Sequence, residues 1–170
     1  KVLAFSKKEK TFRIWDVRTG EEVTVEEKLK KTALSSAHFI LNDLNRTHDE
    51  EGNFTLSYSP LDETQVLNAG LLGAKTLCLI YRYSQDPQHL NAALKIVSYV
   101  VRKQWDDGSW PYGSLPYHQW VDNFHTGYNL ECIYIYKQVS GDTSFDENIN
   151  KGLKYYLETF FTGEGISKYY

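Results

Sequence analysis

The sequence predicts an all-α protein made of repeated helical hairpins, and two observations support this fold class. First, helical stretches run into glycine turns that are 56 and 57 residues apart, at Gly52, Gly108 and Gly165. A period of this length indicates one supersecondary unit repeated along the chain. Second, helices that are apolar on most sides alternate with helices that have one polar face. Since a ring of hairpins needs such inner and outer layers, we expect part of an α/α toroid with about three hairpins.

The first 23 residues follow the helical pattern least well. Residues 11–16 fit either an alternating strand or the end of a degraded inner helix. Because Gly20 corresponds to Gly141 as a turn between the two layers, we favour a helix over residues 1–19. The clear hairpins should therefore lie in residues 24–170.

The remaining elements follow from the spacing of apolar residues. Amphipathic outer helices, each with a single apolar stripe, are predicted over residues 25–44, 87–104 and 145–161. Inner helices, rich in small residues and apolar almost all round, are predicted over residues 65–83 and 122–139. The whole chain, residues 1–170, is then a single toroid domain, which we expect to be a fragment of a longer protein.

The connections between these helices differ in length. Links from an inner to an outer helix are short, at residues 84–87 and 140–143. Links from an outer to an inner helix are long and aromatic, at residues 45–63 and 105–121. Long loops that emerge on one face of a fold commonly carry its binding site, so we expect a ligand there.

Composition excludes several classes of partner. The 170 residues carry a formal net charge of -3, so there is no basic field for nucleic acid or an anionic membrane surface. No apolar run reaches the roughly 20 residues of a membrane span. The cysteines Cys78 and Cys132 lie in apolar stretches and should be free, buried thiols, which favours a reducing, cytoplasmic location. We expect no cofactor.

The candidate catalytic residues stand at the entrances of the inner helices. Asp62 and Asp122 each precede one of these helices, where a carboxylate can act as a general base or bind a sugar hydroxyl. Both also suit helix capping, since Asp62 and Gln65 are spaced almost as in a capping box. His125 lies one turn after Asp122, so it is either an Asp-oriented imidazole for proton transfer or a core histidine.

Glu131 is a further candidate for substrate binding, and Cys132 raises the question of a metal site. Glu131 falls in an apolar helix, where a carboxylate is costly unless it is paired or lines a polar cavity. Asp122, His125 and Cys132 are ligand types found in zinc sites, but Cys132 lies ten residues from Asp122 along one helix. That separation is too large for one ion, so we expect no metal site.

Aromatic residues are concentrated in the second long loop. Their flat faces can grip sugar rings or other amphipathic ligands, or they can simply pack the loop. Tyr112 and Trp120 are the better candidates for binding, and a sugar found between them would favour an enzyme. Trp110 is also a binding candidate, although a buried tryptophan more often serves packing.

The run Gln104-Trp105-Asp106-Asp107-Gly108-Ser109-Trp110 resembles the glutamine-tryptophan repeat of squalene and terpene cyclases. The span from Tyr58 onward looks like a bacterial and archaeal group with the six-hairpin α/α-toroid fold. The most specific matching stretch is residues 120–128, and the others are residues 57–62, Gln65 with Asn68, 107–113 and 154–158.

This resemblance implies a fold and a broad function. Proteins of the group resemble polysaccharide-processing enzymes, so the chain is expected to be a hydrolase, lyase or epimerase that acts on a carbohydrate. The matching stretches supply the remaining candidates for substrate binding: Gln65, Asn68, Asn123 and Tyr128. A non-catalytic toroid that binds a glycan or a protein is the main alternative, and a terpene cyclase is a third. Gln104 and Trp110 look structural in the repeat.

The resemblance also bears on assembly. A complete toroid of this kind needs six hairpins, about twice the number counted here. The cut edges of a partial ring would expose apolar inner-helix surface, which soluble domains rarely tolerate. We therefore expect self-association, or the remaining helices of a longer chain.

Overall fold

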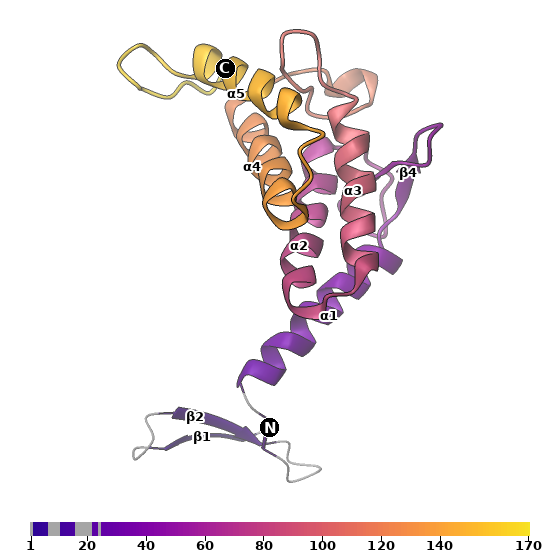
Figure 1. Ribbon diagram of the computed structural model, residues 1–170, viewed down its shortest axis with the longest axis vertical. Coiled ribbons are helices and arrows are strands. Elements are labelled where there is room, and N and C mark those ends of the chain that lie inside the picture. Colours follow the sequence, from indigo (N-terminus) through magenta and orange to yellow (C-terminus); the bar gives the residue numbers. More distant parts are fainter. Residues whose placement is uncertain (1, 7–10, 16–21, 24) are drawn as a thin grey trace.

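The computed structural model describes residues 2–6, 11–15, 22–23 and 25–170. Within them, five α-helices carry the fold, as the sequence predicts (Figure 1). Their bounds are α1 Val25–Asn42, α2 Leu67–Ser84, α3 Pro87–Val101, α4 Asn123–Ser140 and α5 Asp146–Phe160. A short 3-10 turn, η1 Pro116–His118, lies in the second long loop.

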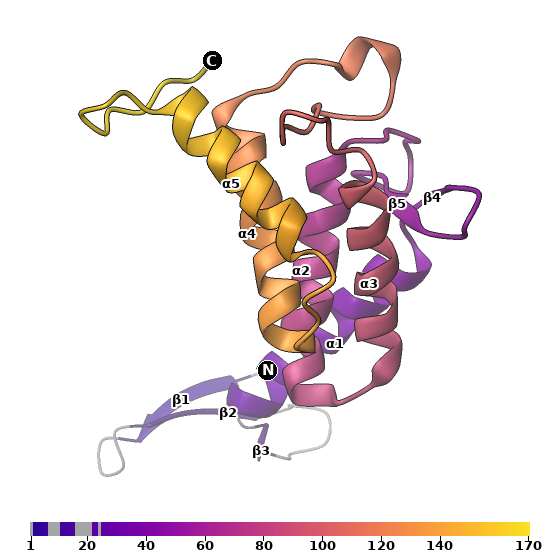
Figure 2. The same cartoon turned by 45° about the horizontal axis from the view of Figure 1, so that its top comes forward.

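The helices form an inner and an outer layer. Helix α2 packs against α3 and α4, and α4 packs in turn against α5. Figure 2 shows α2 and α4 side by side, with α3 and α5 on either side of the pair. Both inner helices contribute fully buried apolar residues to the core, among them Leu71 and Cys78 of α2 and Cys132 and Ile133 of α4. The predicted alternation of buried and amphipathic helices is therefore confirmed.

Helix lengths repeat along the chain. The inner helices α2 and α4 are each 18 residues long and begin 56 residues apart. The outer helices α3 and α5 are each 15 residues long. Asp86 caps α3 by accepting a hydrogen bond from the amide of Gln88 at 2.9 Å, and Pro87 occupies the first turn, where no amide donor is needed.

The three repeat glycines adopt one common turn. Their φ angles are +80°, +94° and +80° at Gly52, Gly108 and Gly165, in the left-handed region that favours glycine. Each glycine amide donates to the carbonyl three residues earlier, at 3.2, 2.9 and 2.9 Å respectively. That earlier residue donates in turn to the carbonyl just after the glycine, at 2.9 Å in all three turns. The sequence period is thus a period of identical backbone geometry.

Each inner helix is tied to the loop of the next repeat. The amide of Leu67 donates to the carbonyl of Tyr112 at 3.0 Å, and the amide of Asn123 donates to that of Tyr169 at 3.0 Å. Tyr112 and Tyr169 both lie four residues after a repeat glycine. These bonds hold the long loops beside the starts of the inner helices, so the loops gather on one face.

The N-terminal helix prediction is wrong. Strands β1 Val2–Ser6, β2 Thr11–Trp15 and β3 Glu22–Val23 form an antiparallel sheet in the order β1-β2-β3. Aromatic and β-branched residues dominate β2, and such residues favour a strand over a helix. The alternative of a strand in residues 11–16 is therefore the better one for Thr11–Trp15. Gly20, the proposed turn, lies outside the described residues.

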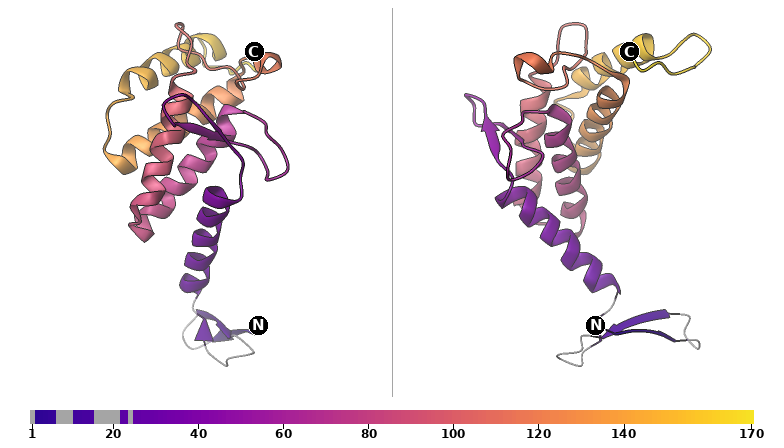
Figure 3. Two further views of the ribbon diagram at one scale, coloured as in Figure 1. Left: turned by 90° about the vertical axis from the view of Figure 1, so that its right-hand side faces the viewer. Right: turned by 180° about the vertical axis from the view of Figure 1, so that it is seen from behind.

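The first long loop contains a hairpin that the sequence pattern did not reveal. Strands β4 Arg46–His48 and β5 Phe54–Leu56 pair antiparallel around the Gly52 turn. All three residues of β5 are buried, and β5 packs on α2 and α3 (Figure 3). Buried strands of three residues lack the alternation by which strands are recognised in sequence.

Candidate functional site

Asp122 and His125 form a close pair at the start of α4. The backbone of Asp122 is extended, and its Oδ1 accepts a hydrogen bond from the amide of His125 at 2.9 Å. Its Oδ2 lies 2.6 Å from His125 Nδ1. The Asp122 side chain is 1% exposed and that of His125 is 25% exposed. The two interpretations of Asp122 are therefore compatible, because one carboxylate caps the helix and binds the imidazole.

The pair fixes the orientation of the imidazole. A carboxylate acceptor places the proton of a neutral ring on Nδ1 and leaves Nε2 as the basic nitrogen. In the described part of the chain, no hydrogen bond engages the His125 imidazole beyond the one with Asp122. A partly exposed, oriented imidazole of this kind can accept or donate a proton.

Aromatic rings from the second long loop surround His125. The ring of Tyr112 lies edge-on to that of His125, with centroids 4.6 Å apart and an interplanar angle of 83°. The face of the Tyr112 ring stacks on the Trp120 ring, with centroids 4.4 Å apart and an interplanar angle of 15°. The two rings are in direct contact, so in this arrangement no space is left between them for a sugar. Trp120 is 42% exposed and retains surface for a ligand.

Tyr58 connects the loop of the preceding repeat to this cluster. Its hydroxyl donates to Asn68 Oδ1 at 3.3 Å and lies 3.3 Å from the hydroxyl of Tyr112. Burial and the bond to Tyr112 raise the pKa of Tyr58 well above its usual range, so it remains a donor. Sequence reasoning did not select Tyr58 as a site residue, although it lies in one of the matching stretches.

His118 is the second residue that sequence reasoning missed. It is buried, and its ring packs edge-on against Tyr112, Tyr117 and Trp120, with centroids 5.1, 4.5 and 5.7 Å away. The main chain supports this packing, because the Gly113 amide donates to the His118 carbonyl at 3.1 Å. A histidine inside an aromatic loop has no distinctive spacing, so the sequence offers no signal for it.

Asp62 organises its own loop rather than capping α2. Its carboxylate accepts bonds from the amide and hydroxyl of Ser59 at 2.7 and 2.6 Å, and from the amide and hydroxyl of Thr64. The Ser59 and Thr64 hydroxyls, together with their amides, lower the pKa of Asp62. The predicted capping box is wrong, since Val66 precedes α2 with no side-chain cap.

No described hydrogen bond joins Asp62 to Asp122 or His125. A catalytic role for Asp62 therefore stays a prediction. Its role in shaping the loop is observed, and this loop also carries Tyr58, whose amide donates to the Asp62 carboxylate at 3.3 Å.

Asn123 and Trp110 are engaged in holding the fold. The Asn123 carboxamide donates to the Lys168 carbonyl at 2.6 Å and accepts from the Tyr156 hydroxyl at 2.9 Å. Trp110 is 2% exposed, and its indole donates to the Val100 carbonyl at 3.1 Å. Both side chains are thus occupied within the protein, which favours packing as the main role of Trp110.

Gln104 ties an outer helix to the following loop, as the repeat resemblance implies. Its side-chain amide donates to the carbonyls of Gly108 and Asn148 at 2.9 Å each. The adjacent Asp107 accepts from the amide and hydroxyl of Ser109 at 2.9 and 2.6 Å. Asp107 of the acidic pair 106–107 therefore shapes the glycine turn, which does not favour a terpene cyclase.

Glu131 is paired rather than isolated. It accepts from Lys75 at 2.6 Å, and the two residues occupy equivalent positions in α4 and α2. The bond to Glu131 raises the pKa of Lys75. One turn before Glu131, Tyr128 packs edge-on to Phe124 with centroids 5.3 Å apart. All four side chains are at least partly exposed.

The described residues form neither a metal site nor a membrane-spanning helix. No group of three or more potential ligands comes together there to hold a metal ion. Both cysteines are free and buried. Likewise, no helix in the described ranges is long and apolar enough to cross a membrane.

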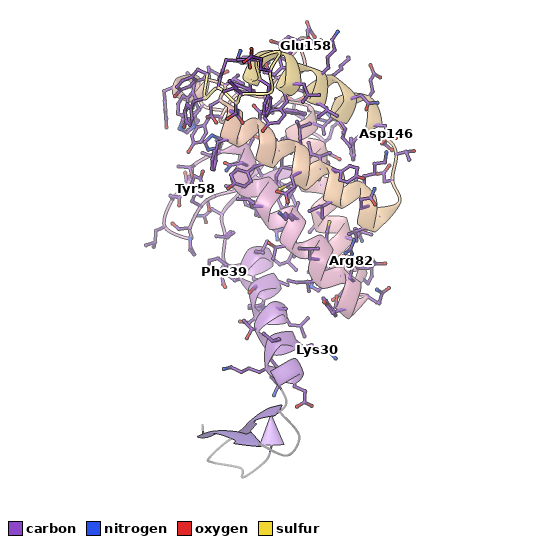
Figure 4. The ribbon with its side chains drawn as sticks, turned by 90° about the vertical axis from the view of Figure 1, so that its left-hand side faces the viewer. Lys30, Phe39, Tyr58, Arg82, Asp146 and Glu158 are labelled. Atoms are coloured by element: carbon purple, nitrogen blue, oxygen red, sulfur yellow. The ribbon has the colours of Figure 1, made fainter. Side chains whose placement is uncertain are left out.

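An apolar groove and a polar pocket are lined by residues other than Asp122 and His125. An apolar groove between α1 and the end of α2 is lined by Leu29, Leu34, Ile80 and Tyr83, among others. A polar pocket lies beside β4. In Figure 4, Tyr58 marks the region of the long loops, whereas Arg82 lies toward the other end of the helices, near the apolar groove.

Comparison with known proteins supports the fold. No protein-family model and no curated protein sequence matches the chain. Among solved structures, the chain is similar to a glycoside hydrolase family 76 mannosidase from Bacteroides thetaiotaomicron, with a TM-score of 0.59 and 12% sequence identity. The match covers 79% of this chain and 39% of the mannosidase. The chain thus has the fold of part of an α/α toroid, and it spans less than half the length of that relative.

Proposed function

We propose that the chain binds a carbohydrate on its long-loop face and that Asp122 and His125 act on the bound sugar. Comparison of the two inner helices carries this proposal. The positions equivalent to Asp122 and His125 at the start of α2 are Val66 and Ala69. Helix α2 nonetheless begins with the same bond to the following loop and without a side-chain cap. Since the fold builds this helix start without an Asp-His pair, the pair suits a role other than architecture.

The chemistry of the pair is proton transfer. Asp122 holds Nδ1 of His125 and stabilises the imidazolium that forms when Nε2 takes a proton. Edge contact with Tyr112 restricts rotation of the imidazole ring. An oriented histidine of this kind can serve hydrolysis, β-elimination or epimerisation of a sugar, because each reaction needs a positioned acid or base.

Trp120 supplies the platform for the sugar. Flat aromatic surfaces bind the apolar faces of sugar rings, and the exposed part of Trp120 lies in the cluster that includes Tyr112 and His125. The similar solved structure is a mannosidase, so carbohydrate is the ligand class that its fold supports. Mannose-containing oligosaccharides are accordingly the first probes to test.

The second candidate is a non-catalytic glycan- or protein-binding scaffold. The observation in its favour is that Asp122 also caps α4 and is almost completely buried. In this case the loop aromatics bind the ligand, and His125 contributes only a hydrogen bond.

We further propose a cytoplasmic location, which is supported by the two free thiols.

One experiment separates the two candidates. Neutral and acidic oligosaccharides are incubated with the wild type, with His125→Gln, and with His38→Gln as an exposed control on α1. The catalytic proposal predicts shortened, unsaturated or epimerised products, detected by mass spectrometry and NMR, which His125→Gln loses by at least about 100-fold. Binding without any product in the wild type would support the scaffold, and an equal product yield from His125→Gln would contradict the role of the pair.

A further inference from the structure

The polar pocket beside β4 has the features of a second ligand site. It has a volume of about 410 Å³, within the range of small-molecule sites. One wall is the strand β4, with Thr47 and His48, and the other is the segment before α2, with Glu63 and Gln65. Both walls come from the first repeat, whereas the Asp122 pair belongs to the start of α4.

The residues of this pocket fall into two groups. Asn45, Ser57 and Thr64 are committed to the fold, because their side chains bond to neighbouring loop atoms. By contrast, the polar side chains of four lining residues form no hydrogen bond or ion pair with any described residue. They are Thr47, His48, Glu63 and Gln65. Successive side chains of a strand point to opposite faces, and the His48 ring packs on Phe54, as Arg46 does. The Thr47 hydroxyl, the Glu63 carboxylate and the Gln65 carboxamide are therefore the groups available to a ligand.

The charges in the pocket narrow the class of ligand. The carboxylate of Glu63 disfavours an anionic ligand and accepts hydrogen bonds from hydroxyl groups. Arg46 is a cation in the lining, but its guanidinium is engaged within the protein. It donates to the Leu41 carbonyl and lies 4.5 Å from the centroid of the Phe54 ring. The Gln65 carboxamide and the Thr47 hydroxyl can both donate and accept hydrogen bonds, as neighbouring hydroxyls of a neutral sugar require.

We propose that this pocket is a subsite for a neutral sugar residue, bound through Glu63, Gln65 and Thr47. The proposal rests on the proposed function, since it concerns the same class of ligand. The two regions are adjacent along the loops, because the Gln65 carbonyl accepts from the Ser114 amide at 2.9 Å and Val66 forms a bridge with Gly113. A glycan that crosses this junction can contact both the pocket and the loop that carries Trp120.

Calorimetric titration with three neutral trisaccharides (mannotriose, cellotriose and maltotriose) and with trigalacturonate tests the subsite. The variants are Glu63→Gln and Gln65→Ala in the pocket and Trp120→Ala at the aromatic platform. Glu50→Gln is the matched control, because Glu50 is an exposed carboxylate on the same hairpin and does not line the pocket. Circular dichroism verifies that each variant is folded.

We expect at least one neutral trisaccharide to bind, with Kd about five- to tenfold weaker in Glu63→Gln and in Gln65→Ala and unchanged in Glu50→Gln. Weakening by Trp120→Ala alone would overturn the subsite and leave the proposed function standing. Weakening by the pocket variants alone would keep the subsite and overturn the role of Trp120. Tighter binding of trigalacturonate than of every neutral probe would overturn the neutral-sugar assignment, and no binding of any probe would overturn both proposals.

Discussion

Asp122 shows what can and what cannot be inferred from single residues. Its spacing from His125 predicts contact across one helical turn, and the structure confirms that contact at 2.6 Å. Capping and proton transfer look like competing roles in sequence, but two carboxylate oxygens allow both. The stacking of Tyr112 on Trp120 was not predictable, because ring orientation in a loop depends on contacts from distant segments.

Substitutions of Asp122 should separate its two roles. Asn is as good an N-cap as Asp, so Asp122→Asn should retain most of the stability while losing the charged partner of His125. Asp122→Ala should lose the cap as well and cost at least about 1 kcal/mol more. Urea denaturation measures both effects, alongside the product assay. Equal destabilisation by the two variants would contradict the assignment of Oδ1 as the cap.

At the scale of elements, the glycine period was the most informative signal. It predicted turns that share one backbone geometry, and the alternating helix types predicted the two layers. Strands β1 and β3 and the β4-β5 hairpin were not predicted, and a strand over residues 11–16 was one of two alternatives. Strands of two to five residues are defined by pairing with distant partners, such as Val2 with Trp15, and short apolar runs do not specify those partners.

Two of the repeat glycines offer a matched comparison. A Cβ at Gly108 would lie 2.5 Å from the Lys151 carbonyl oxygen, whereas a Cβ at Gly165 meets nothing within 4 Å. Gly165→Ala should therefore lower the free energy of unfolding by only about 1–2 kcal/mol, which is the cost of holding alanine in the left-handed conformation. Gly108→Ala adds a backbone collision and should cost clearly more, as urea denaturation can measure. Equal costs would show that the loop at Gly108 yields without penalty.

The buried thiols on the inner helices predict a loss of stability in alkaline solution. Burial raises the pKa of Cys78 and of Cys132 from 9.0 to about 12. Between these values the unfolded thiols ionise while the native ones stay protonated, so stability declines as pH rises from about 9 to about 12. Comparing the pH dependence of urea unfolding for the wild type and the double variant Cys78→Ala/Cys132→Ala isolates this effect. An equally steep decline in the double variant would contradict it.

At the scale of the whole molecule, the helices form two layers, and 79% of the chain matches 39% of a larger toroid. The sequence predicted this layering because buried and amphipathic helices alternate, but it did not predict the apolar groove between α1 and α2. That groove includes Leu29, which is 64% exposed, and Tyr83, which is 77% exposed. Exposed apolar surface of this kind is typical of an interface, which supports the proposal of self-association or of further hairpins that cover it.

Self-association has a direct test. Light scattering coupled to size-exclusion chromatography should show a mass that falls toward 19.7 kDa on dilution. The variant Leu29→Glu/Tyr83→Glu should shift the equilibrium to the monomer, because it places charge in the groove. Leu61→Glu is a control, since Leu61 is exposed but lies outside the groove. A monomer at every concentration would contradict self-association through this surface.

The most direct test of the central claim is a crystal structure of the protein soaked with neutral and acidic oligosaccharides. The account predicts a sugar on the exposed face of Trp120, with a glycosidic oxygen, ring carbon or hydroxyl within reach of His125 Nε2. A sugar bound elsewhere, with His125 in contact only with Asp122 and Tyr112, would contradict a role for this pair in carbohydrate chemistry.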